Sequence, residues 1–519
     1  MTTIVQTAQG KLQGMFEADT AVYQFKGIPF AAPPVGELRW QAPQPMAAWD
    51  GIRQATDFGP RAMQLPVFGD MNFRSNGMSE DCLYLNVWTP DPSAHSQLPV
   101  LVYFYGGGFI AGDGSEPRYD GTQMARKGIV AVTVNYRLNI FGFFSHPELS
   151  AAASHHASGN YGFLDQNAAL LWVRDNIAAF GGDPNRVTIA GESAGSMSVN
   201  AHMVSPLSKE LFAGAIGASG GLGTLSPRPL AEAEQIGQAF AKKVKAQSLA
   251  QLRALPAQKL LEATEGMAPP EFPSVIDGAF FPDAPLEALA AGKGAQVPLM
   301  VGWNSEEMPY LALFGNQPPT PENYAAIVQE LYGDQADQIL KLYPGTTQEE
   351  VEQSATDLAG DRFLVYSTWK WAEDHQQSGN PVYRYYYAHP RPPMVPEMAN
   401  AIAGLAGGII EDAAAAEEAI IMPPAKGAVH SADIEYAMGN LATNKVYAWT
   451  AEDKQVSALM QGYYANFVKT GNPNGPGLPE WPRMDASTKM QAMVWDVEPH
   501  VMVEPHRARY TFHDEFFNK

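Results

Sequence analysis

The sequence contains very little cysteine and no long apolar run. Cys82 is the only cysteine among 519 residues, so no disulfide can form within the chain and the fold must depend on packing. No run of about 18 apolar residues occurs, which argues against a membrane-spanning helix. The first residues also lack the basic and apolar blocks of a signal peptide. We therefore expect a soluble protein, either cytoplasmic or exported with its leader removed.

Basic residues are scarce as well. The chain has 34 Lys and Arg residues against 55 Asp and Glu, which gives a formal net charge of -21. Such a surface would repel a phosphate backbone, whose binding depends on Lys and Arg. We therefore exclude nucleic acid as a partner, while the oligomeric state stays open.

Strand and helix patterns alternate along the chain. Buried strands are predicted over 100–105, 129–135, 186–190 and 297–303, where β-branched and aromatic residues cluster, and a helix is predicted over 167–180. This alternation predicts a mostly parallel sheet with helices on both faces. Length alone suggests two or three domains. The stretch Pro392–Pro424 is rich in Ala, Gly and Pro and has no basic residue, so we predict an insertion at about 391–424.

One serine stands at a predicted sharp turn from strand to helix. Gly191-Glu192-Ser193-Ala194-Gly195 follows the strand 186–190 and opens a helix over 194–204. A serine hydroxyl needs a base and an exposed position before it can attack a carbonyl carbon. Flanking glycines let the backbone make the turn that exposes it. Ser193 is therefore the candidate nucleophile.

The same five-residue pattern occurs a second time, around Ser219. The sequence Gly217-Ala218-Ser219-Gly220-Gly221 matches it, but the residues up to Pro227 form a loop that cannot open a helix at once. Because the motif requires strand, turn and helix in succession, Ser219 is rejected as the nucleophile.

A run of glycines follows the predicted strand 100–105. Gly106-Gly107-Gly108 brings bare backbone close to any substrate held at Ser193. Acyl transfer places negative charge on the carbonyl oxygen, and N–H groups aimed at that oxygen are typically the largest catalytic effect. We predict an oxyanion hole from the N–H groups of Gly107, Gly108 and Ala194, the last at the start of a helix. A merely flexible glycine loop is the alternative.

These residues resemble the type-B carboxylesterase and cholinesterase family, in particular its bacterial carboxylesterases, over almost the whole chain. Residues Gly27–Ala31 with Leu38–Trp40 resemble the family's opening, Glu80–Trp88 its second signature, and Gly182–Gly195 its nucleophile signature. The resemblance implies a single α/β-hydrolase domain over 1–519: a large, mostly parallel central sheet with helices on both faces and inserted helical and loop segments. This replaces the expectation of two or three domains.

The resemblance also indicates the base. In this fold the nucleophile, acid and histidine follow one another along the chain. Gly427-Ala428-Val429-His430, followed by Asp433-Ile434-Glu435-Tyr436, is similar to the family's histidine loop, which implies His430. The remaining downstream histidines lack this setting and are expected to be surface or structural residues: His375, His389, His500, His506 and His513. With a free imidazole as base, activity should fall as the pH drops through about 6 to 7.

The acid is expected just after the strand 297–303, at the carboxyl end where such sheets place their chemistry. The family's motif implies Glu307. Glu306 stays as the alternative, because the family usually has Gly after the acid and Met308 stands there. Glu192 and Ser219 match family positions close to the nucleophile, acid and base, although either could be purely structural.

Two departures from the family concern the substrate and the histidine loop. Cholinesterases carry a choline-binding tryptophan, in a loop closed by the cysteine of the second signature, and residues 61–79 contain neither Trp nor Cys. An aromatic cage for a quaternary ammonium group is therefore not expected. Ser431 replaces a glycine common in the family, and the sequence offers no explanation.

Taken together, the motifs predict a carboxylic ester hydrolase that uses Ser193, Glu307 and His430, forms an acyl-enzyme, and needs neither cofactor nor metal. A lipase-like hydrolase and a non-catalytic binding module of the same fold are the alternatives. Small to medium esters are expected, including those of bulky tertiary alcohols, because three glycines leave room beside the reacting carbon. A side chain at Gly107 should then hinder tertiary esters more than primary ones.

Overall fold

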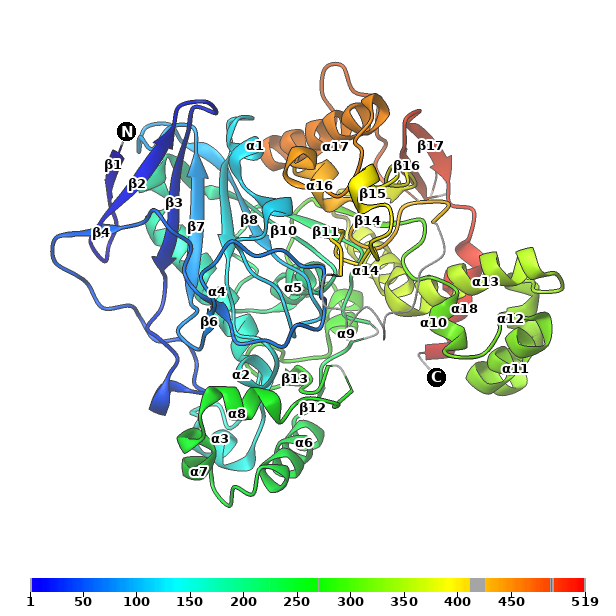
Figure 1. Cartoon of the computed structure of the whole chain (residues 1–519), viewed down its shortest axis with the longest axis horizontal. Helices are drawn as coiled ribbons and strands as arrows, with labels where there is room; N and C mark the ends of the chain where they lie inside the picture. The colour runs from blue at the N-terminus through cyan, green and yellow to red at the C-terminus, as the bar shows by residue number, and fades with distance from the viewer. Residues whose placement is uncertain are drawn as a thin grey trace.

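The computed structural model describes residues 2–517 except for 224, 269, 411–424, 486, 488 and 489. Among these residues, one 13-stranded sheet forms the centre of the molecule (Figure 1). Its strand order is β1-β2-β3-β7-β9-β8-β10-β11-β14-β15-β16-β17, and β4 pairs with β2. The strands are β1 (Thr2–Gln6), β2 (Lys11–Glu17), β3 (Val22–Pro29), β4 (Ile52–Gln54), β7 (Tyr84–Thr89), β8 (Leu98–Phe104), β9 (Val130–Val134), β10 (Gly182–Glu192), β11 (Gly214–Ala218), β14 (Leu299–Asn304), β15 (Val382–Tyr387), β16 (Gln491–Trp495) and β17 (His500–Val503).

The middle of the sheet is parallel and its ends are antiparallel. Strands β9, β8, β10, β11, β14, β15 and β16 pair with one another in parallel. The pairs β1–β2, β2–β3, β3–β7, β7–β9 and β16–β17 are antiparallel. Strands β9, β11 and β14 are buried along their whole length, as expected for strands covered on both faces. The prediction of a mostly parallel sheet is confirmed, and the four predicted strands correspond to β8, β9, β10 and β14.

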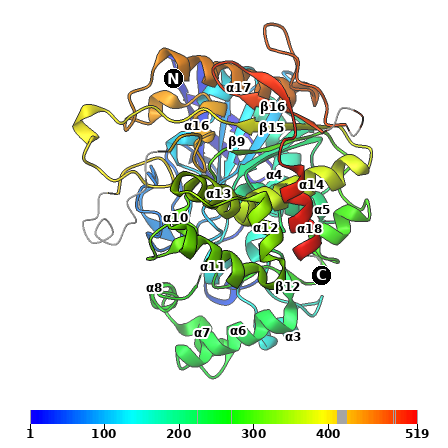
Figure 2. The same ribbon diagram turned by 90° about the vertical axis from the view of Figure 1, so that its right-hand side faces the viewer.

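Helices cover the sheet and extend from it. In Figures 1 and 2, α16 and α17 lie on one side of the sheet and α5 and α14 on the other. The helices are α1 (Thr122–Ala125), α2 (Asn139–Phe143), α3 (Pro147–Ala152), α4 (Tyr161–Asn176), α5 (Ala194–Val204), α6 (Leu230–Lys243), α7 (Leu249–Ala254), α8 (Ala257–Glu262), α9 (Pro285–Ala290), α10 (Leu311–Phe314), α11 (Pro321–Tyr332), α12 (Ala336–Leu342), α13 (Gln348–Gly360), α14 (Tyr366–Gln377), α16 (Ile434–Ala437), α17 (Ala451–Thr470) and α18 (Arg507–Phe517).

Shorter elements join these helices and strands. They are the 3-10 turns Gly36–Leu38, Pro117–Tyr119, Ile177–Phe180, Gly333–Gln335, Pro396–Met398 and Leu441–Thr443, the π-helical turn Asp361–Val365, and the two-residue strands β5 (Arg61–Ala62), β6 (Met78–Ser79), β12 (Arg228–Pro229) and β13 (Val275–Ile276).

Helix α4 begins earlier than its sequence pattern suggests. We predicted a helix over 167–180, whereas α4 starts at Tyr161 and passes into a 3-10 turn that ends at Phe180. Its first turns carry Asp165, fully buried against Arg137, and this polar residue conceals the apolar periodicity. The end is as predicted, because Gly181 takes a left-handed conformation with φ 84°.

Helices α10 to α13 form a group at one end of the sheet, with a hydrophobic core of their own. Tyr324, Ile339 and Leu358 lie in that core, and Phe512 of α18 packs into it. Helices α6, α7 and α8 form a second projection at the bottom of Figure 1.

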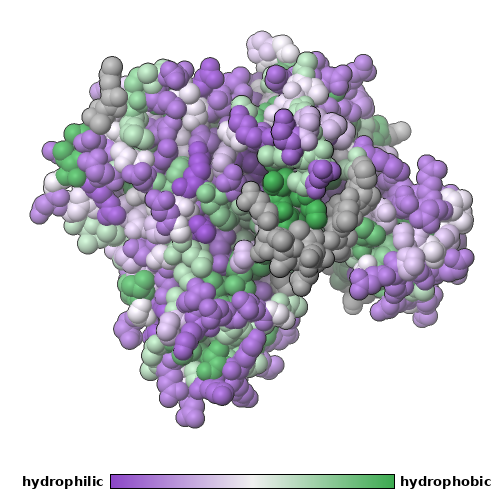
Figure 3. All heavy atoms as spheres, in the orientation of Figure 1, coloured by the Kyte–Doolittle hydropathy of each residue, from purple (hydrophilic) through white to green (hydrophobic). Residues whose placement is uncertain are grey.

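The space-filling view shows the face that Figure 1 presents to the viewer. Apolar residues gather near its middle, and polar residues cover most of the rest (Figure 3).

Part of the predicted insertion at 391–424 lies in the described residues. Met394 pairs with Tyr447, and residues 402–410 fold back on themselves through the bridge between Ala403 and Ile409. We call residues 402–410 the insert hairpin. Residues 411–424 lie outside the described residues. Within the described ranges, no helix has the length and apolarity that crossing a membrane requires.

Candidate active site

Ser193 stands at a strained turn between β10 and α5. Its backbone has φ 55° and ψ −122°, in a region that residues with side chains rarely adopt. The turn brings backbones so close that no side chain fits beside it: a Cβ atom at Gly195 would lie 2.1 Å from the carbonyl oxygen of Phe104. The predicted helix 194–204 is present as α5. The local sequence thus explains why this serine projects at the carboxyl end of the parallel sheet.

The structure brings Ser193, His430 and Glu307 into one chain of hydrogen bonds. The hydroxyl of Ser193 lies 3.0 Å from Nε2 of His430, and Nδ1 of His430 lies 2.6 Å from Oε2 of Glu307. His430 and Glu307 are 5% and 1% exposed, so water competes little for these bonds. This is the geometry that a serine needs in order to pass its proton to a base.

Glu307, rather than Glu306, faces the base. The backbone N–H of Asn304 donates to Oε1 of Glu307 at 2.6 Å, which leaves Oε2 for His430. Glu306 instead accepts a hydrogen bond from the backbone N–H of Lys426 at 2.9 Å. The side chain of Asn304 also donates to the carbonyl oxygen of Val429 at 2.8 Å and so joins the acid's strand to the histidine loop.

Two further buried carboxylic acids surround His430. Oε1 of Glu192 lies 3.2 Å from Nε2 of His430, and Asp433 accepts a hydrogen bond from the Asn304 side chain at 3.2 Å. Burial raises the pKa of Glu192 to about 8, and burial together with Glu307 raises the pKa of Asp433 to about 6. Asp433 had no predicted role of its own, although its position three residues after His430 was a possible signal.

These acids change the expected pH behaviour of the base. Burial by itself lowers the pKa of His430, but Glu192 and Glu307 outweigh burial and raise it to about 9. A histidine acts as a base only when it is neutral, so the loss of activity on acidification should occur above the range of 6 to 7 expected for a free imidazole. The same carboxylates stabilise the imidazolium that forms during proton transfer.

The backbone N–H groups of Gly107 and Gly108 are free to bind an anion. In the described part of the chain neither donates to another group, whereas the carbonyl oxygen of Gly107 accepts from the N–H groups of Ile110 and Ala111. Ala194 begins α5, so its N–H has no acceptor within the helix. All three predicted donors therefore remain available beside Ser193.

The three glycines differ in what a side chain would meet. A Cβ at Gly107 would lie 2.3 Å from the carbonyl oxygen of Ala111, so a side chain there would displace the loop; its effect on tertiary against primary esters stays a prediction. A Cβ at Gly106 would lie 2.7 Å from the carbonyl oxygen of Glu192. At Gly108 the nearest atom beyond its chain neighbours would be Cγ1 of Ile110, at 3.6 Å, so among the three only this position has room for a Cβ, and there a side chain would still be strained by the φ of 64°.

Ser219 lies beside the nucleophile without occupying an elbow. It follows β11 and leads into a loop, as predicted, and its N–H donates to the carbonyl oxygen of Gly302 at 2.8 Å. The N–H of Ser193 donates to the carbonyl oxygen of Ala218, the neighbour of Ser219, at 2.8 Å. The buried hydroxyl of Ser219 has no hydrogen-bond partner among the described residues.

The structure explains Ser431. Its φ of 64° lies in the left-handed region that favours glycine. Its hydroxyl accepts a hydrogen bond from Nη1 of Arg118 at 3.1 Å and donates to the carbonyl oxygen of Leu405 at 2.9 Å. Because Leu405 belongs to the insert hairpin, this serine ties the histidine loop to the insertion, which a glycine could not do.

The other histidines have different surroundings. Several of them are buried and make hydrogen bonds away from Ser193. These bonds join His202 to Ser208 and Gln166, His375 to the carbonyl oxygen of Val297, His389 to Asp453, and His513 to Tyr343. His500 is exposed and His506 is partly exposed.

Among the described residues, no group of His, Cys, Asp and Glu side chains is arranged to hold a metal ion.

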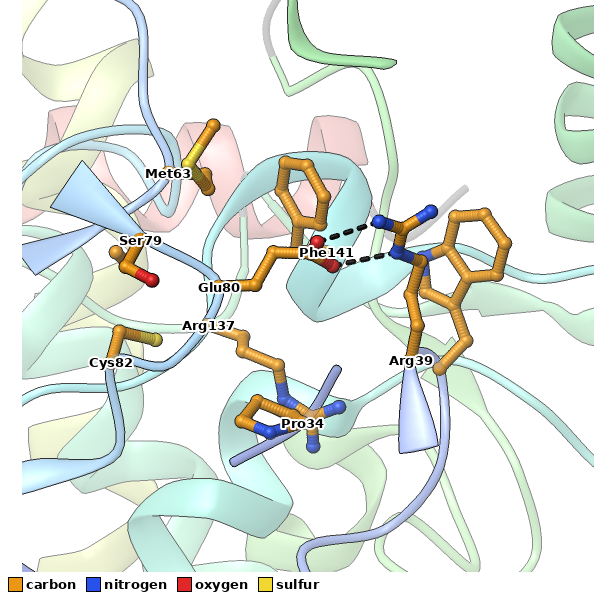
Figure 4. A pocket seen from close by; sticks show the side chains of 10 residues that line it. Pro34, Arg39, Met63, Ser79, Glu80, Cys82, Arg137 and Phe141 are labelled. Carbon is orange, nitrogen blue, oxygen red and sulfur yellow. Dashed lines mark hydrogen bonds and ion pairs between the residues drawn. The ribbon is translucent and has the colours of Figure 1, made fainter. Parts of the chain in front are cut away.

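A small cavity lies among residues of the two N-terminal family motifs. Arg39 donates two hydrogen bonds to Glu80, both at 2.6 Å, beside a space of about 10 Å³ (Figure 4). That is room for about one water molecule. None of Ser193, Glu307 and His430 lines it. The cavity is therefore too small for an ester, and the pair of Arg39 with Glu80 joins two segments of the chain.

The fold and the arrangement of these residues define the class of the protein. A mostly parallel sheet with helices on both faces carries Ser193 at a sharp turn after one strand, Glu307 after a later strand and His430 on a loop further along the chain, and the three are joined by hydrogen bonds. The protein is an α/β-hydrolase.

Comparison with known proteins gives the family. The sequence model of the carboxylesterase family matches residues 1–513, and the chain belongs to this family. It is 34% identical to a mouse acylcarnitine hydrolase, over 95% of this chain and 86% of that one. It is also 34% identical to a fumonisin B1 esterase of Sphingopyxis macrogoltabida, over 92% and 84%. The crystal structure of Geobacillus stearothermophilus carboxylesterase EST55 superposes with a TM-score of 0.81 at 31% identity, over 98% of this chain and 100% of that one.

Proposed function

We propose that this carboxylesterase works through Ser193, His430 and Glu307 and forms a covalent acyl-enzyme. The observation that carries the proposal is the continuous pair of hydrogen bonds, 3.0 Å from Ser193 to His430 and 2.6 Å from His430 to Glu307, at the end of a strained elbow. An intact nucleophile, base and acid also argue against a non-catalytic binding module.

The reaction follows from this geometry. His430 takes the proton of the Ser193 hydroxyl as its oxygen attacks the ester carbonyl, and Glu307 stabilises the imidazolium. The N–H groups of Gly107, Gly108 and Ala194 stabilise the oxyanion. His430 then gives its proton to the leaving alcohol. A water molecule, activated by the same histidine, hydrolyses the acyl-enzyme and releases the acid.

The substrates proposed are small to medium esters, including esters of tertiary alcohols. Support comes from the glycine loop, because residues 106–108 place no side chain beside the reacting carbon. A tertiary alcohol brings three carbon branches to that place as the tetrahedral intermediate forms.

We also propose that the chain is one domain and that its insertion borders the site. The 13-stranded sheet includes β1 near the start and β17 near the end of the chain, which supports one folding unit. The insert hairpin contacts both sides of the site. The N–H of Gly408 in the hairpin donates to Asp70 at 3.2 Å. Met71, the residue after Asp70, lies against the glycine loop 106–108, with its Cε 3.3 Å from where a Cβ of Gly107 would be. On the other side Leu405 accepts the bond from Ser431.

Two serine variants test the proposed nucleophile. Ser193→Ala should reduce p-nitrophenyl acetate hydrolysis by at least about 10⁴-fold, since the attacking oxygen is gone. Ser219→Ala is the matched control, because Ser219 lies in the same five-residue pattern beside the same elbow, and it should keep more than about a tenth of the activity. Equal losses in the two folded variants would refute the assignment of Ser193.

A further inference from the structure

A π-helical turn lies directly against the proposed acid and base. Residues Asp361–Val365 form this turn between α13 and α14. A Cβ atom at Gly360, immediately before it, would lie 3.3 Å from Cβ of Glu307. Within the turn, the ring of Phe363 packs against the ring of His430 with centroids 5.9 Å apart and an interplanar angle of 68°. Such turns are rare and frequently occur at functional sites.

The turn is held by a buried chain of hydrogen bonds that the reaction does not use. The hydroxyl of Tyr343 donates to Asp361 at 2.6 Å and lies 3.0 Å from Nε2 of His513. Tyr343 and His513 are fully buried and Asp361 is 6% exposed. His513 belongs to α18, which lies beside α12 and α14 in Figure 2. The chain therefore connects the C-terminal helix to a turn that contacts both Glu307 and His430.

The charges around Asp361 show that this chain is not an ion pair. Burial raises the pKa of Asp361 to about 7, against the opposing effects of the Tyr343 hydroxyl and Arg509, while Asp357 raises it further. Arg509 itself pairs with Asp357 at 2.7 Å. Burial, with Arg362 and Arg509, lowers the pKa of His513 to about 3, so His513 is neutral. Burying a carboxyl group without a salt-bridge partner costs stability.

We propose that Asp361, Tyr343 and His513 are positioning residues for catalysis: their hydrogen bonds hold the π turn so that Gly360 and Phe363 keep Glu307 and His430 aligned with Ser193. This inference rests on the proposed roles of those three residues. A π turn contains one residue more per hydrogen-bonded ring than an α turn. If the turn reverted to α geometry, Phe363 would move relative to His430, and misplacement of a catalytic group by about 1 Å can cost about 10²-fold in rate.

The experiment measures turnover per active site. Tyr343→Phe removes the central hydroxyl and keeps the ring. Tyr463→Phe is the matched control, because Tyr463 is also fully buried and its hydroxyl also makes a hydrogen bond, to the carbonyl oxygen of Pro479 at 2.8 Å. Active sites are counted with a phosphonate that labels the nucleophile, and hydrolysis of p-nitrophenyl acetate is measured on the same samples. Loss of folded protein lowers the number of sites, whereas misalignment lowers kcat per site.

We expect Tyr343→Phe to lower kcat per titrated site by about five- to tenfold with KM changed less than about twofold, and Tyr463→Phe to leave both within about twofold. Asp361→Asn keeps an acceptor for Tyr343 and should retain kcat, whereas Asp361→Leu should behave like Tyr343→Phe.

Normal turnover per site in Tyr343→Phe would overturn the inference, whatever its melting temperature. If Tyr343→Phe does not fold, kcat per titrated site is compared between Asp361→Asn and Asp361→Leu. Equal values in these two variants would overturn the inference. Failure of all three to fold would assign these residues to the fold rather than to the site, and would also overturn the inference. Labelling of wild-type enzyme at a residue other than Ser193 would instead refute the proposed function.

Discussion

Replacing Glu307 with Gln should put His430, the proposed base, in the wrong tautomer. The backbone N–H of Asn304 can only donate, and it holds one oxygen of Glu307 at 2.6 Å. A glutamine has a single side-chain oxygen, which Asn304 will take, and its NH₂ group then faces Nδ1 of His430. Because both an amide NH₂ and an N–H are donors, Nδ1 must give up its proton. The proton moves to Nε2, which can then no longer accept the proton of Ser193.

The structure also sets the size of the effect. At the 2.6 Å between Nδ1 and Oε2, with an effective dielectric constant of about 20, the attraction between imidazolium and carboxylate is on the order of 6 kcal/mol. Each 1.36 kcal/mol corresponds to a factor of ten in rate, so loss of the charge amounts to about four powers of ten. A histidine in the wrong tautomer loses a similar factor of about 10⁴ in rate.

The assay is kcat for p-nitrophenyl acetate, normalised to folded protein. Glu306→Gln is the matched control, since that side chain accepts from Lys426 and does not contact the base, and it should lose less than about threefold. The reasoning is refuted if Glu307→Gln keeps more than a tenth of wild-type kcat, or if Glu306→Gln is the more damaged variant.

Three other outcomes follow from the site. Glu192 raises the pKa of His430, so Glu192→Gln should move the acid limb of the pH profile of kcat/KM to lower pH by about one unit or more. An acid limb at the wild-type pH would mean that Glu192 does not face His430 in solution. Gly108→Ala should slow tert-butyl acetate at least about fivefold more than ethyl acetate, because the added methyl takes up space in the glycine loop, where its nearest contact would be Ile110 at 3.6 Å, while the strain at φ 64° slows both esters alike; no Ser193-dependent release of tert-butanol by the wild type would rule out this substrate class. Ser431→Gly keeps the left-handed backbone but removes the hydrogen bond to Leu405 of the insert hairpin. The ratio of butyrate to acetate hydrolysis should then change by about threefold or more, while kcat for acetate stays within about twofold. An unchanged ratio would show that the hairpin does not affect specificity.

The parts of the site that lie in contiguous sequence could be predicted. The elbow at Ser193, the glycine loop and the histidine loop each consist of a few neighbouring residues whose types follow from local backbone geometry. The acid could be predicted only to within one residue, because neighbouring side chains at a strand end point in opposite directions and the pattern does not say which one faces the base.

Other features depend on contacts between residues distant in sequence. The bond from Arg118 to Ser431 spans 313 positions, and that from Tyr343 to His513 spans 170. No motif marks either pair. The three glycines in the oxyanion loop show another limit: they are identical in sequence, but the φ angles of 109° at Gly107 and 64° at Gly108 send their Cβ positions into different surroundings.

The acidic composition of the chain also affects the end of the proposed catalytic cycle. Each turnover leaves a carboxylic acid beside Ser193, and at neutral pH that product is an anion. The whole chain carries a formal net charge of -21, and its long-range field repels an anion but not a neutral ester. The excess of acidic residues that argues against nucleic acid as a partner therefore favours departure of the product once the ester is cleaved.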